Sequence, residues 1–159
     1  MIIREYTIDD IADMIAIWNE VIEEGNAFPH EEMLDEESAK EFFASQSYTG
    51  VAELAEGVTG LYILHPNNIG RCVHICNASY AVISEKRGLR IGRELVVDCI
   101  NKARELGFRI LQFNAVVESN VAARHLYEKL GFKQLGTIPQ GFRMKDGNYE
   151  NICPYYIEL

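Results

Sequence analysis

The chain has 159 residues, of which 48% are hydrophobic and 25% are charged, and its formal net charge is -9. This length suits one domain over residues 1–159 with a substantial core. The acidic balance argues against broad binding to nucleic acid or anionic membranes, because phosphate groups would be repelled by most of the surface. No segment approaches the roughly 20 apolar residues of a membrane helix, and no secretory signal is recognisable. We therefore expect a cytoplasmic protein whose cysteines are free thiols.

The first half of the chain predicts a strand, two helices and two more strands. Apolar residues recur at helical spacing over residues 8–24, where Thr7 and Asp10 resemble a capping box. A second helix is expected at residues 36–45. The strands of this half are expected at residues 1–7, 48–55 and 60–65.

The second half predicts strands that alternate with helices. Residues 71–83 are expected to form one long strand with a bulge or bend. Residues 139–150 are rich in turn residues and predict a loop. Helices are expected at residues 91–105 and 119–130, and strands at residues 108–117, 132–138 and 151–159.

This order of elements favours an α/β (α+β) fold with a mixed sheet. The run of strands in the middle of the chain suggests antiparallel pairing. Strand, helix and strand from residue 72 to 116 suggest a parallel pair with a right-handed crossover. Helices would then cover both faces of the sheet.

The segment "SEKRGLRIGREL", residues 84–95, gathers positive charge where a strand ends and a helix begins. N–H groups at a helix start have no partner within the helix, and the helix dipole adds partial positive charge there. Gly88 and Gly92 allow a ligand close to the backbone. This combination fits a phosphate or pyrophosphate site, although a solvent-facing basic loop has a similar composition. The cationic residues are Lys86, Arg87, Arg90 and Arg93.

Two common nucleotide-binding motifs do not fit this loop. A dinucleotide fingerprint needs G-x-G-x-x-G in the first strand–helix–strand unit. A P-loop needs G-x-x-x-x-G-K-[ST], whereas the span from Gly88 to Gly92 is too short and Arg93 is followed by neither Ser nor Thr.

Two segments resemble the GNAT superfamily of acetyl-CoA-dependent N-acetyltransferases. Residues 87–92, "RGLRIG", resemble the Q/R-x-x-G-x-G/A loop that cradles the coenzyme A pyrophosphate in that family, with Arg90 where the pattern has Gly. Residues 120–132 match the N-x-x-A-x-x-L-Y-x-x-x-G-F pattern. The resemblance implies a mixed, mostly antiparallel sheet of about seven strands, splayed between strands 4 and 5.

The resemblance also implies which residues bind acetyl-CoA as co-substrate, with no metal. A bulged strand near residues 81–83 would polarise the thioester carbonyl and pair with the pantetheine arm. An Arg at position 90 could add a charge contact to phosphate. The implied coenzyme-binding residues are Ala81, Val82, Ile83, Arg87, Gly88, Leu89, Arg90, Ile91, Gly92, Arg93, Asn120, Ala123 and Tyr127.

Tyr127 and Asn120 are the candidate catalytic residues. The resemblance implies that the Tyr127 phenol protonates the departing thiolate, a role that a pKa around 10 permits. Asn120 would contact the coenzyme or steady the reacting amine. As structural alternatives, Tyr127 would belong to the core and Asn120 would cap the following helix.

Asn77 and Asn114 are the candidate substrate-binding residues. Each is a polar residue within a buried-looking strand, and a buried amide needs a partner. The surrounding segments resemble a branch of the family that acetylates amino acids and proline analogues such as azetidine-2-carboxylate. In that branch, asparagines at the matching places are thought to bind the substrate carboxylate. The structural alternative is that each of these amides forms hydrogen bonds with backbone groups at a bulge.

The sequence assigns no general base and no metal. His74 is the only titratable ring in the 71–83 strand, and Glu118 lies near the second motif. Cys72, His74 and Cys76 would share one face of that strand, which raises the possibility of zinc. A structural zinc site needs a second ligand pair at suitable spacing, so core packing is the preferred explanation.

Three functions follow, in order of preference. The first is acetylation of the amine of a small molecule, an amino acid or analogue, by direct attack in a ternary complex. The second is acetylation of a protein N-terminus or lysine, which requires an open groove near residues 25–33 and 139–150. The third is a non-catalytic coenzyme A sensor. A homodimer is also possible, through an edge formed by the C-terminal "CPYYIEL".

Overall fold

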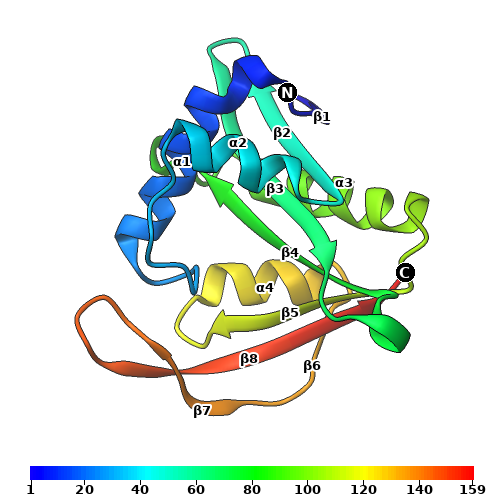
Figure 1. The fold of residues 1–159 in the computed structure, drawn as a ribbon. Coiled ribbons are helices and arrows are strands. Elements are labelled where there is room, and N and C mark those ends of the chain that lie inside the picture. Colours follow the sequence, from blue (N-terminus) through cyan, green and yellow to red (C-terminus); the bar gives the residue numbers. More distant parts are fainter.

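The computed structural model describes residues 1–159 as one eight-stranded sheet with helices on both faces (Figure 1). The strands follow the order β1-β2-β3-β4-β5-β8-β6, and β7 pairs with β8. The strands are β1 (Ile2–Glu5), β2 (Tyr48–Leu54), β3 (Gly57–Pro66), β4 (Ile75–Val82), β5 (Ile110–Val117), β6 (Lys133–Gln134), β7 (Ile138–Arg143) and β8 (Tyr149–Glu158). The α-helices are α1 (Ile11–Glu24), α2 (Glu36–Ala44), α3 (Ile91–Glu105) and α4 (Val121–Lys129).

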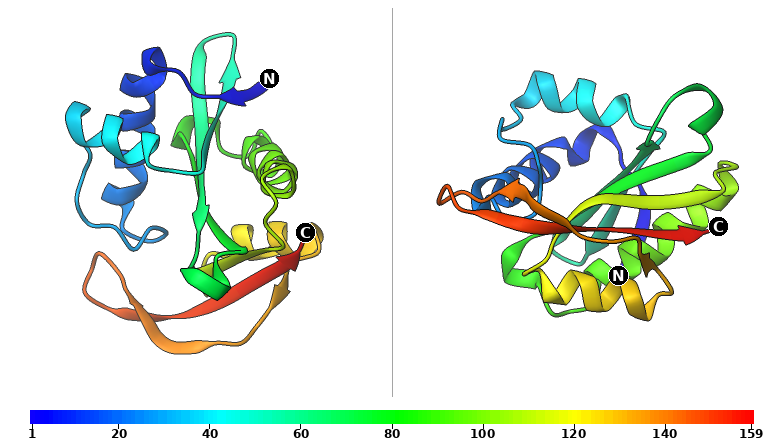
Figure 2. Two further views of the ribbon diagram at one scale, coloured as in Figure 1. Left: turned by 45° about the vertical axis from the view of Figure 1, so that its right-hand side comes forward. Right: turned by 90° about the horizontal axis from the view of Figure 1, so that it is seen from below.

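The two faces of the sheet carry separate hydrophobic cores. In β3, side chains alternate between the faces, so Leu61 and Ile63 pack toward α1 and α2, while Tyr62 and Leu64 pack toward α3 and α4. Figure 2 shows the helices in these two layers. The predicted mixed sheet with helices on both faces is confirmed. Not one of the helices has the length and apolar character that crossing a membrane requires.

The sheet opens between β4 and β5. These two strands are parallel, as predicted, but they pair only through Ile75 with Ile110 and Cys76 with Leu111. Beyond Cys76 the strands diverge, as Figure 1 shows, and the backbone edges that face each other are left unpaired. The predicted splay is therefore present, and it creates the space for a site within the sheet.

The strand expected at residues 71–83 begins later than predicted. Gly70–Cys72 forms a 3-10 helix, and β4 begins only at Ile75. Residues 71–74 are exposed and do not belong to a core strand. Consequently Cys72, His74 and Cys76 do not share a strand face, and core packing applies to Cys76 but not to Cys72.

The expected bulge of this strand is also absent. β4 pairs with β3 in continuous register from Cys76 to Val82. The irregularity instead lies in β5, between Phe113 and Val116 where that strand pairs with β8.

The segment predicted as a loop at residues 139–150 contains most of β7. Pro139 and Gly141 are typical of turns, but here they lie in an irregular part of the β7–β8 pairing, between Ile138 and Phe142. β8 is an inner strand, flanked by β5 on one side and by β6 and β7 on the other. The C-terminal segment is therefore no exposed edge, and a homodimer would have to use another edge.

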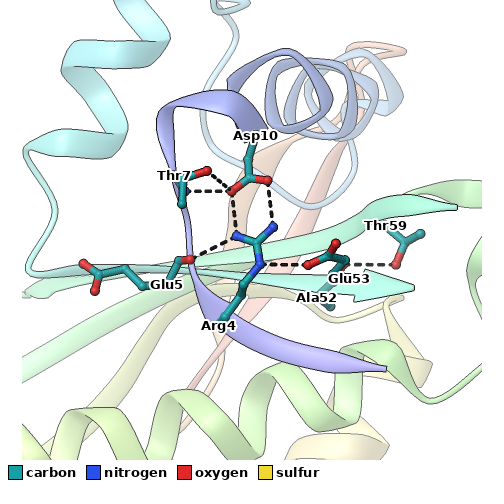
Figure 3. A network of polar contacts seen from close by, with 7 residues as sticks. All are labelled: Arg4, Glu5, Thr7, Asp10, Ala52, Glu53 and Thr59. Atoms are coloured by element: carbon teal, nitrogen blue, oxygen red, sulfur yellow. Dashed lines mark hydrogen bonds and ion pairs between the residues drawn. The ribbon is translucent and has the colours of Figure 1, made fainter. Parts of the chain in front are cut away.

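A network of polar contacts fixes the N-terminal strand (Figure 3). The Arg4 guanidinium donates to both Asp10 carboxylate oxygens at 2.7 and 2.9 Å, and to Glu53 of β2 at 2.8 Å. Asp10 also accepts from the Thr7 N–H, which confirms the predicted capping box. Hydrogen bonds from Arg4, and to a lesser extent from Thr7, lower the pKa of Asp10 to about 2. Desolvation of the carboxylate raises this pKa but is outweighed.

Candidate active site

A cavity of about 1350 Å³ lies where β4 and β5 diverge. Its walls come from the end of α1 and the loop after it, the end of β3, the strands β4 and β5, the loop before α3, and α4. All predicted site residues line it except Ala81, Ile83 and Leu89. Ala81 and Ile83 belong to the core beneath α1 and α2, and Leu89 is exposed.

The β4 backbone faces this cavity at every second residue. The Ile83 N–H donates to Thr59 of β3 at 3.0 Å, and the Ile75 carbonyl accepts from Asn67 N–H at 2.8 Å. Because backbone groups alternate along a strand, those of Ala78, Tyr80 and Val82 point to the open side. The hydrogen bond from Arg87 Nε to the Val82 carbonyl, at 3.3 Å, agrees with this orientation.

The loop before α3 presents free backbone donors. None of the N–H groups from Gly88 to Arg93 donates a hydrogen bond within the protein. Gly88 has a φ of 85° and Arg90 a φ of 65°, so residue 90 holds the left-handed conformation that the family pattern assigns to Gly. The free donors lie at the positive end of the α3 dipole, which suits a phosphate group.

The cations of this loop differ in their partners. Lys86 pairs with Glu56, Arg87 with Glu24 at 2.9 Å, and Arg93 with Glu94 at 2.5 Å. Arg90 forms no ion pair and remains available to an incoming anion. Glu24 is the one carboxylate residue among those that line the cavity, so the cavity is cationic although the chain is acidic.

Tyr127 projects from α4 into an aromatic cluster beside the cavity. Its ring lies 4.5 Å from that of Phe113 and 5.6 Å from that of Phe132, centroid to centroid. Burial raises the pKa of the Tyr127 hydroxyl, which forms no hydrogen bond within the protein. The phenol therefore stays protonated at neutral pH and has a proton to donate.

Asn120 caps α4, which was the structural alternative for this residue. Its Oδ1 accepts from the Ala123 N–H at 3.3 Å. The amide nitrogen of Asn120 has no partner, and the residue also lines the cavity. The Asn120 side chain can therefore cap α4 with its oxygen and contact a ligand with its nitrogen.

Asn77 and Asn114 come together through a third amide, Asn67, that the sequence analysis did not select. Nδ2 of Asn114 and Nδ2 of Asn77 both donate to Asn67 Oδ1, at 2.7 and 3.2 Å. Asn67 donates back to Asn114 Oδ1 at 3.2 Å. These three side chains, the amide cluster, join the end of β3 and the start of β4 to the middle of β5. In the sequence, Asn67 lies in "HPNNIG", residues 65–70, a composition that is equally typical of a simple turn between strands.

Three histidines line the cavity: His30, His65 and His125. His74 and Glu118, considered from the sequence, do not line it. The His30 ring packs against Trp18, Phe28 and Phe42 at centroid distances of 6.1–6.3 Å. His30 is exposed overall, but partial desolvation beside these rings lowers the pKa of His30, and the nearby His65 lowers it further.

The β7–β8 hairpin contacts the loop after α1 beside this cavity. Lys145 donates from its N–H to the Gly25 carbonyl at 3.2 Å and from Nζ to the Glu23 carbonyl at 2.7 Å. Arg143 and Glu31 form an ion pair at 2.5 Å. A smaller cavity of about 680 Å³ lies along this contact, and His30 lines both cavities. Residues 25–33 and 139–150, between which an open peptide groove would have to lie, are therefore in contact.

Known proteins share this fold over nearly the whole chain. Residues 12–132 match the acetyltransferase (GNAT) family. A GCN5-related N-acetyltransferase from Kribbella flavida superposes with a TM-score of 0.91 at 32% identity, over 99% of this chain and 97% of that one. A ribosomal-protein-alanine N-acetyltransferase from Brucella melitensis superposes with a TM-score of 0.93 at 26% identity, over 100% of both chains.

Two further proteins are similar to this chain. The N-acetyltransferase aca1 of Schizosaccharomyces pombe is 28% identical over 87% of this chain and 74% of its own length. A phosphinothricin acetyltransferase from Sinorhizobium meliloti, solved in complex with AcCoA, shares the fold with a TM-score of 0.91 at 20% identity, over 99% of this chain and 88% of that one. The chain belongs to the acetyltransferase (GNAT) family, and it is an acyltransferase with acetyl-CoA as its co-substrate.

Proposed function

We propose that the protein acetylates the amine of a small molecule that also carries a carboxylate, such as an amino acid or a proline analogue. The amine attacks acetyl-CoA directly in a ternary complex. The observation that carries this proposal is the composition of the acceptor end of the cavity. It is lined by the amide cluster, and the β7–β8 hairpin adds Met144 to the lining and holds the loop after α1 through Lys145.

The coenzyme diphosphate would bind the free N–H groups of residues 88–93. Arg90 adds an unpaired charge, and Gly88 and Gly92 leave room for close approach. The pantetheine arm would pair with the open edge of β4, and the N–H of Tyr80 or Val82 would polarise the thioester carbonyl. The sequence analysis expected residues 81–83 to polarise this carbonyl. Of these, Ile83 is not available, because its N–H already donates to β3.

Tyr127 would protonate the sulfur as the C–S bond breaks. Its phenol is protonated, unpartnered and on the helix that begins at Asn120. Asn120, Ala123 and Tyr127 line the same wall of the cavity at successive turns of α4, and this supports a shared role in holding and protonating the coenzyme thiol end.

The acceptor carboxylate would bind the amide cluster. The donors of Asn77 and Asn114 now converge on a single oxygen, that of Asn67. A substrate carboxylate offers the same convergent donors two oxygens with a full charge, and charge-assisted hydrogen bonds are stronger than neutral ones. A cationic cavity with one carboxylate also disfavours polyamines, so a zwitterion fits better.

Acetylation of a protein N-terminus is the second candidate. The similarity to the Brucella melitensis ribosomal-protein-alanine N-acetyltransferase favours it. The contacts of Lys145 and Arg143 with the loop after α1 oppose it, because a peptide would need the groove that they close.

Thiol release from acetyl-CoA separates these candidates. We expect turnover with free amino acids or proline analogues, and none with polyamines or peptides. Turnover with alanine-initiated peptides alone would establish the second candidate. Tight coenzyme binding without thiol release on any acceptor would indicate a sensor.

A further inference from the structure

We propose that the Asn67 side chain occupies the carboxylate subsite of the cavity and that the acceptor carboxylate displaces it. This inference rests on the proposed acetyl transfer to a small molecule that carries a carboxylate. It names a residue that sets how tightly such an acceptor binds. It follows from the direction of the hydrogen bonds within the amide cluster.

The two donors proposed for the acceptor carboxylate are already engaged within the protein. Asn114 Nδ2 and Asn77 Nδ2 donate to Asn67 Oδ1, at 2.7 and 3.2 Å. Neither nitrogen has another acceptor in the protein. A carboxylate that binds these two nitrogens therefore has to take the place of the Asn67 oxygen. Asn67 is thus an internal competitor of the acceptor.

A purely supporting role for Asn67 would require a different pattern of contacts. A side chain that only held the cluster in place would bind the amide oxygens and leave the N–H groups open to the cavity. Asn67 Nδ2 does donate to Asn114 Oδ1 at 3.2 Å, but Gln112 Nε2 donates to the same oxygen at 3.0 Å. Asn77 lies within β4, opposite His65 in the β3–β4 register. The strands and Gln112 therefore hold the two donors without Asn67.

The Asn67 side chain can turn aside while the main chain stays in place. Its backbone N–H donates to the Ile75 carbonyl at 2.8 Å, which fixes the start of the β3–β4 connection. The side chain is partly exposed, and its only hydrogen bonds lie within the amide cluster. Displacement therefore needs a change of rotamer and no movement of a strand.

An anion gains by this exchange, whereas a neutral group does not. A neutral oxygen would replace two neutral hydrogen bonds by two similar ones, against a competitor that the chain keeps at high effective concentration. A carboxylate forms charge-assisted hydrogen bonds, which are about twice as strong. Glu24, the one carboxylate residue of the cavity lining, is paired with Arg87 beside the loop before α3. The lining therefore places no unpaired negative charge against the acceptor.

Two substitutions of Asn67 should move the acceptor KM in opposite directions. Asn67→Ala removes the competitor, so KM should fall about fivefold, the scale of one neutral hydrogen bond, with kcat unchanged. Asn67→Asp keeps the shape and places a carboxylate on the same two donors, so KM should rise at least about tenfold, the scale of a charged hydrogen bond. Acetyl-CoA affinity measured by calorimetry should stay unchanged in both variants, which also shows that both are folded.

Asn68→Asp is the matched control. Asn68 is exposed and outside the cavity, and its Oδ1 accepts from the Ile69 N–H at 2.8 Å, a bond that a carboxylate keeps. The variant adds the same charge one residue along the chain. It should change KM by less than about twofold, because an exposed charge is screened by salt.

The acceptors are chosen in pairs that differ only in the carboxylate. L-proline is paired with pyrrolidine, and L-leucine with isoamylamine. The wild type should have a lower KM for each amino acid than for the amine without the carboxylate. For the two amines, Asn67→Ala and Asn67→Asp should match the wild type, because these acceptors do not use the amide cluster.

The results that would overturn displacement differ from those that would overturn the proposed function. A KM for the amino acids that stays level or rises in Asn67→Ala, or stays level in Asn67→Asp, would refute displacement; a rise in both variants would give Asn67 a supporting role instead. Equal wild-type KM values within each acceptor pair would refute carboxylate recognition. Absence of thiol release on every acceptor would remove the acetyl transfer, and either of these last two results would remove displacement with it.

Discussion

Arg87 lies between Glu24 and the Val82 carbonyl, with its guanidinium 2.9 Å from the carboxylate and its Nε 3.3 Å from the carbonyl oxygen. The end of α1 is thereby tied to the open edge of β4, next to the loop at residues 87–92. Glu24 orients Arg87, and under the proposed coenzyme binding it would compete with the diphosphate for Arg87.

The first prediction concerns this competition. Glu24→Gln should strengthen acetyl-CoA binding by about two- to fivefold, the scale of a partly exposed ion pair, because a repulsive charge is removed and Arg87 is freed. Titration calorimetry at low salt measures the change. Arg87→Gln should weaken binding. Weaker binding by Glu24→Gln would mean that orienting Arg87 matters more than freeing it.

The second prediction concerns Gly92 in the first turn of α3. A Cβ added there would meet only Val82 Cγ2, at 3.9 Å, so the fold has room for it. The free energy of unfolding should rise by up to about 1 kcal/mol, because Ala favours helices over Gly. Acetyl-CoA affinity should fall at least about tenfold, since the methyl group occupies space beside the free N–H groups.

Gly136→Ala is the control for this change, because nothing lies within 4 Å of its added Cβ and the residue is outside the cavity. It should leave the affinity unchanged. Unaltered coenzyme binding by Gly92→Ala would remove the diphosphate from this loop.

The third prediction separates the two properties of Arg90, its charge and its left-handed backbone. Arg90→Gly and Arg90→Ala both remove the charge and should weaken acetyl-CoA binding to a similar extent, with a smaller salt dependence. Arg90→Gly should unfold with a free energy about 1 kcal/mol higher than Arg90→Ala, because Gly adopts a φ of 65° without strain. Binding by Arg90→Ala as tight as the wild type would exclude a phosphate contact.

The fourth prediction concerns Tyr127. Tyr127→Phe keeps the ring packed on Phe113 and removes only a hydroxyl without a hydrogen bond, so stability should be nearly unchanged. The value of kcat should fall about 100-fold, because the departing thiolate loses its proton donor, while acetyl-CoA affinity stays the same. Tyr156→Phe, outside the cavity, is the control. Equal turnover by the two variants would exclude the proposed role.

Local motifs were predictable because their chemistry lies in adjacent residues. The loop from Arg87 to Gly92 and the helix that follows Asn120 depend on short-range spacing, and both line the cavity. Asn67 was not predictable in the same way. Asn67 meets Asn114 across 47 positions of sequence, and that meeting is set by strand register and by the divergence of β4 from β5.

The errors in the predicted elements have a related origin. Pro139 and Gly141 are typical of turns, but β8 supplies a partner strand that overrides the local preference. Residues 71–74 were predicted as the start of the strand that follows them, yet no partner strand pairs with them and they are exposed. In both cases the outcome depends on what lies beside the segment in space.

The last prediction concerns acid stability through Asp10. Arg4 and Thr7 lower the pKa of Asp10 from 3.8 to about 2, and the carboxylate is 9% exposed. The stabilisation is therefore complete above pH 3.8 and lost as the pH falls through about 2. A difference of nearly two pKa units corresponds to about 2 kcal/mol.

Urea unfolding of the wild type and Asp10→Asn from pH 7 to pH 2 measures this contribution. Asp10→Asn should lose about 2 kcal/mol at pH 7, and the difference should shrink below pH 4 because the wild-type carboxyl becomes protonated. Glu53→Gln removes the other, more exposed partner of Arg4 and should cost less than about 1 kcal/mol. A pH-independent difference between wild type and Asp10→Asn would show that packing, and not the charge on Asp10, stabilises the start of the chain.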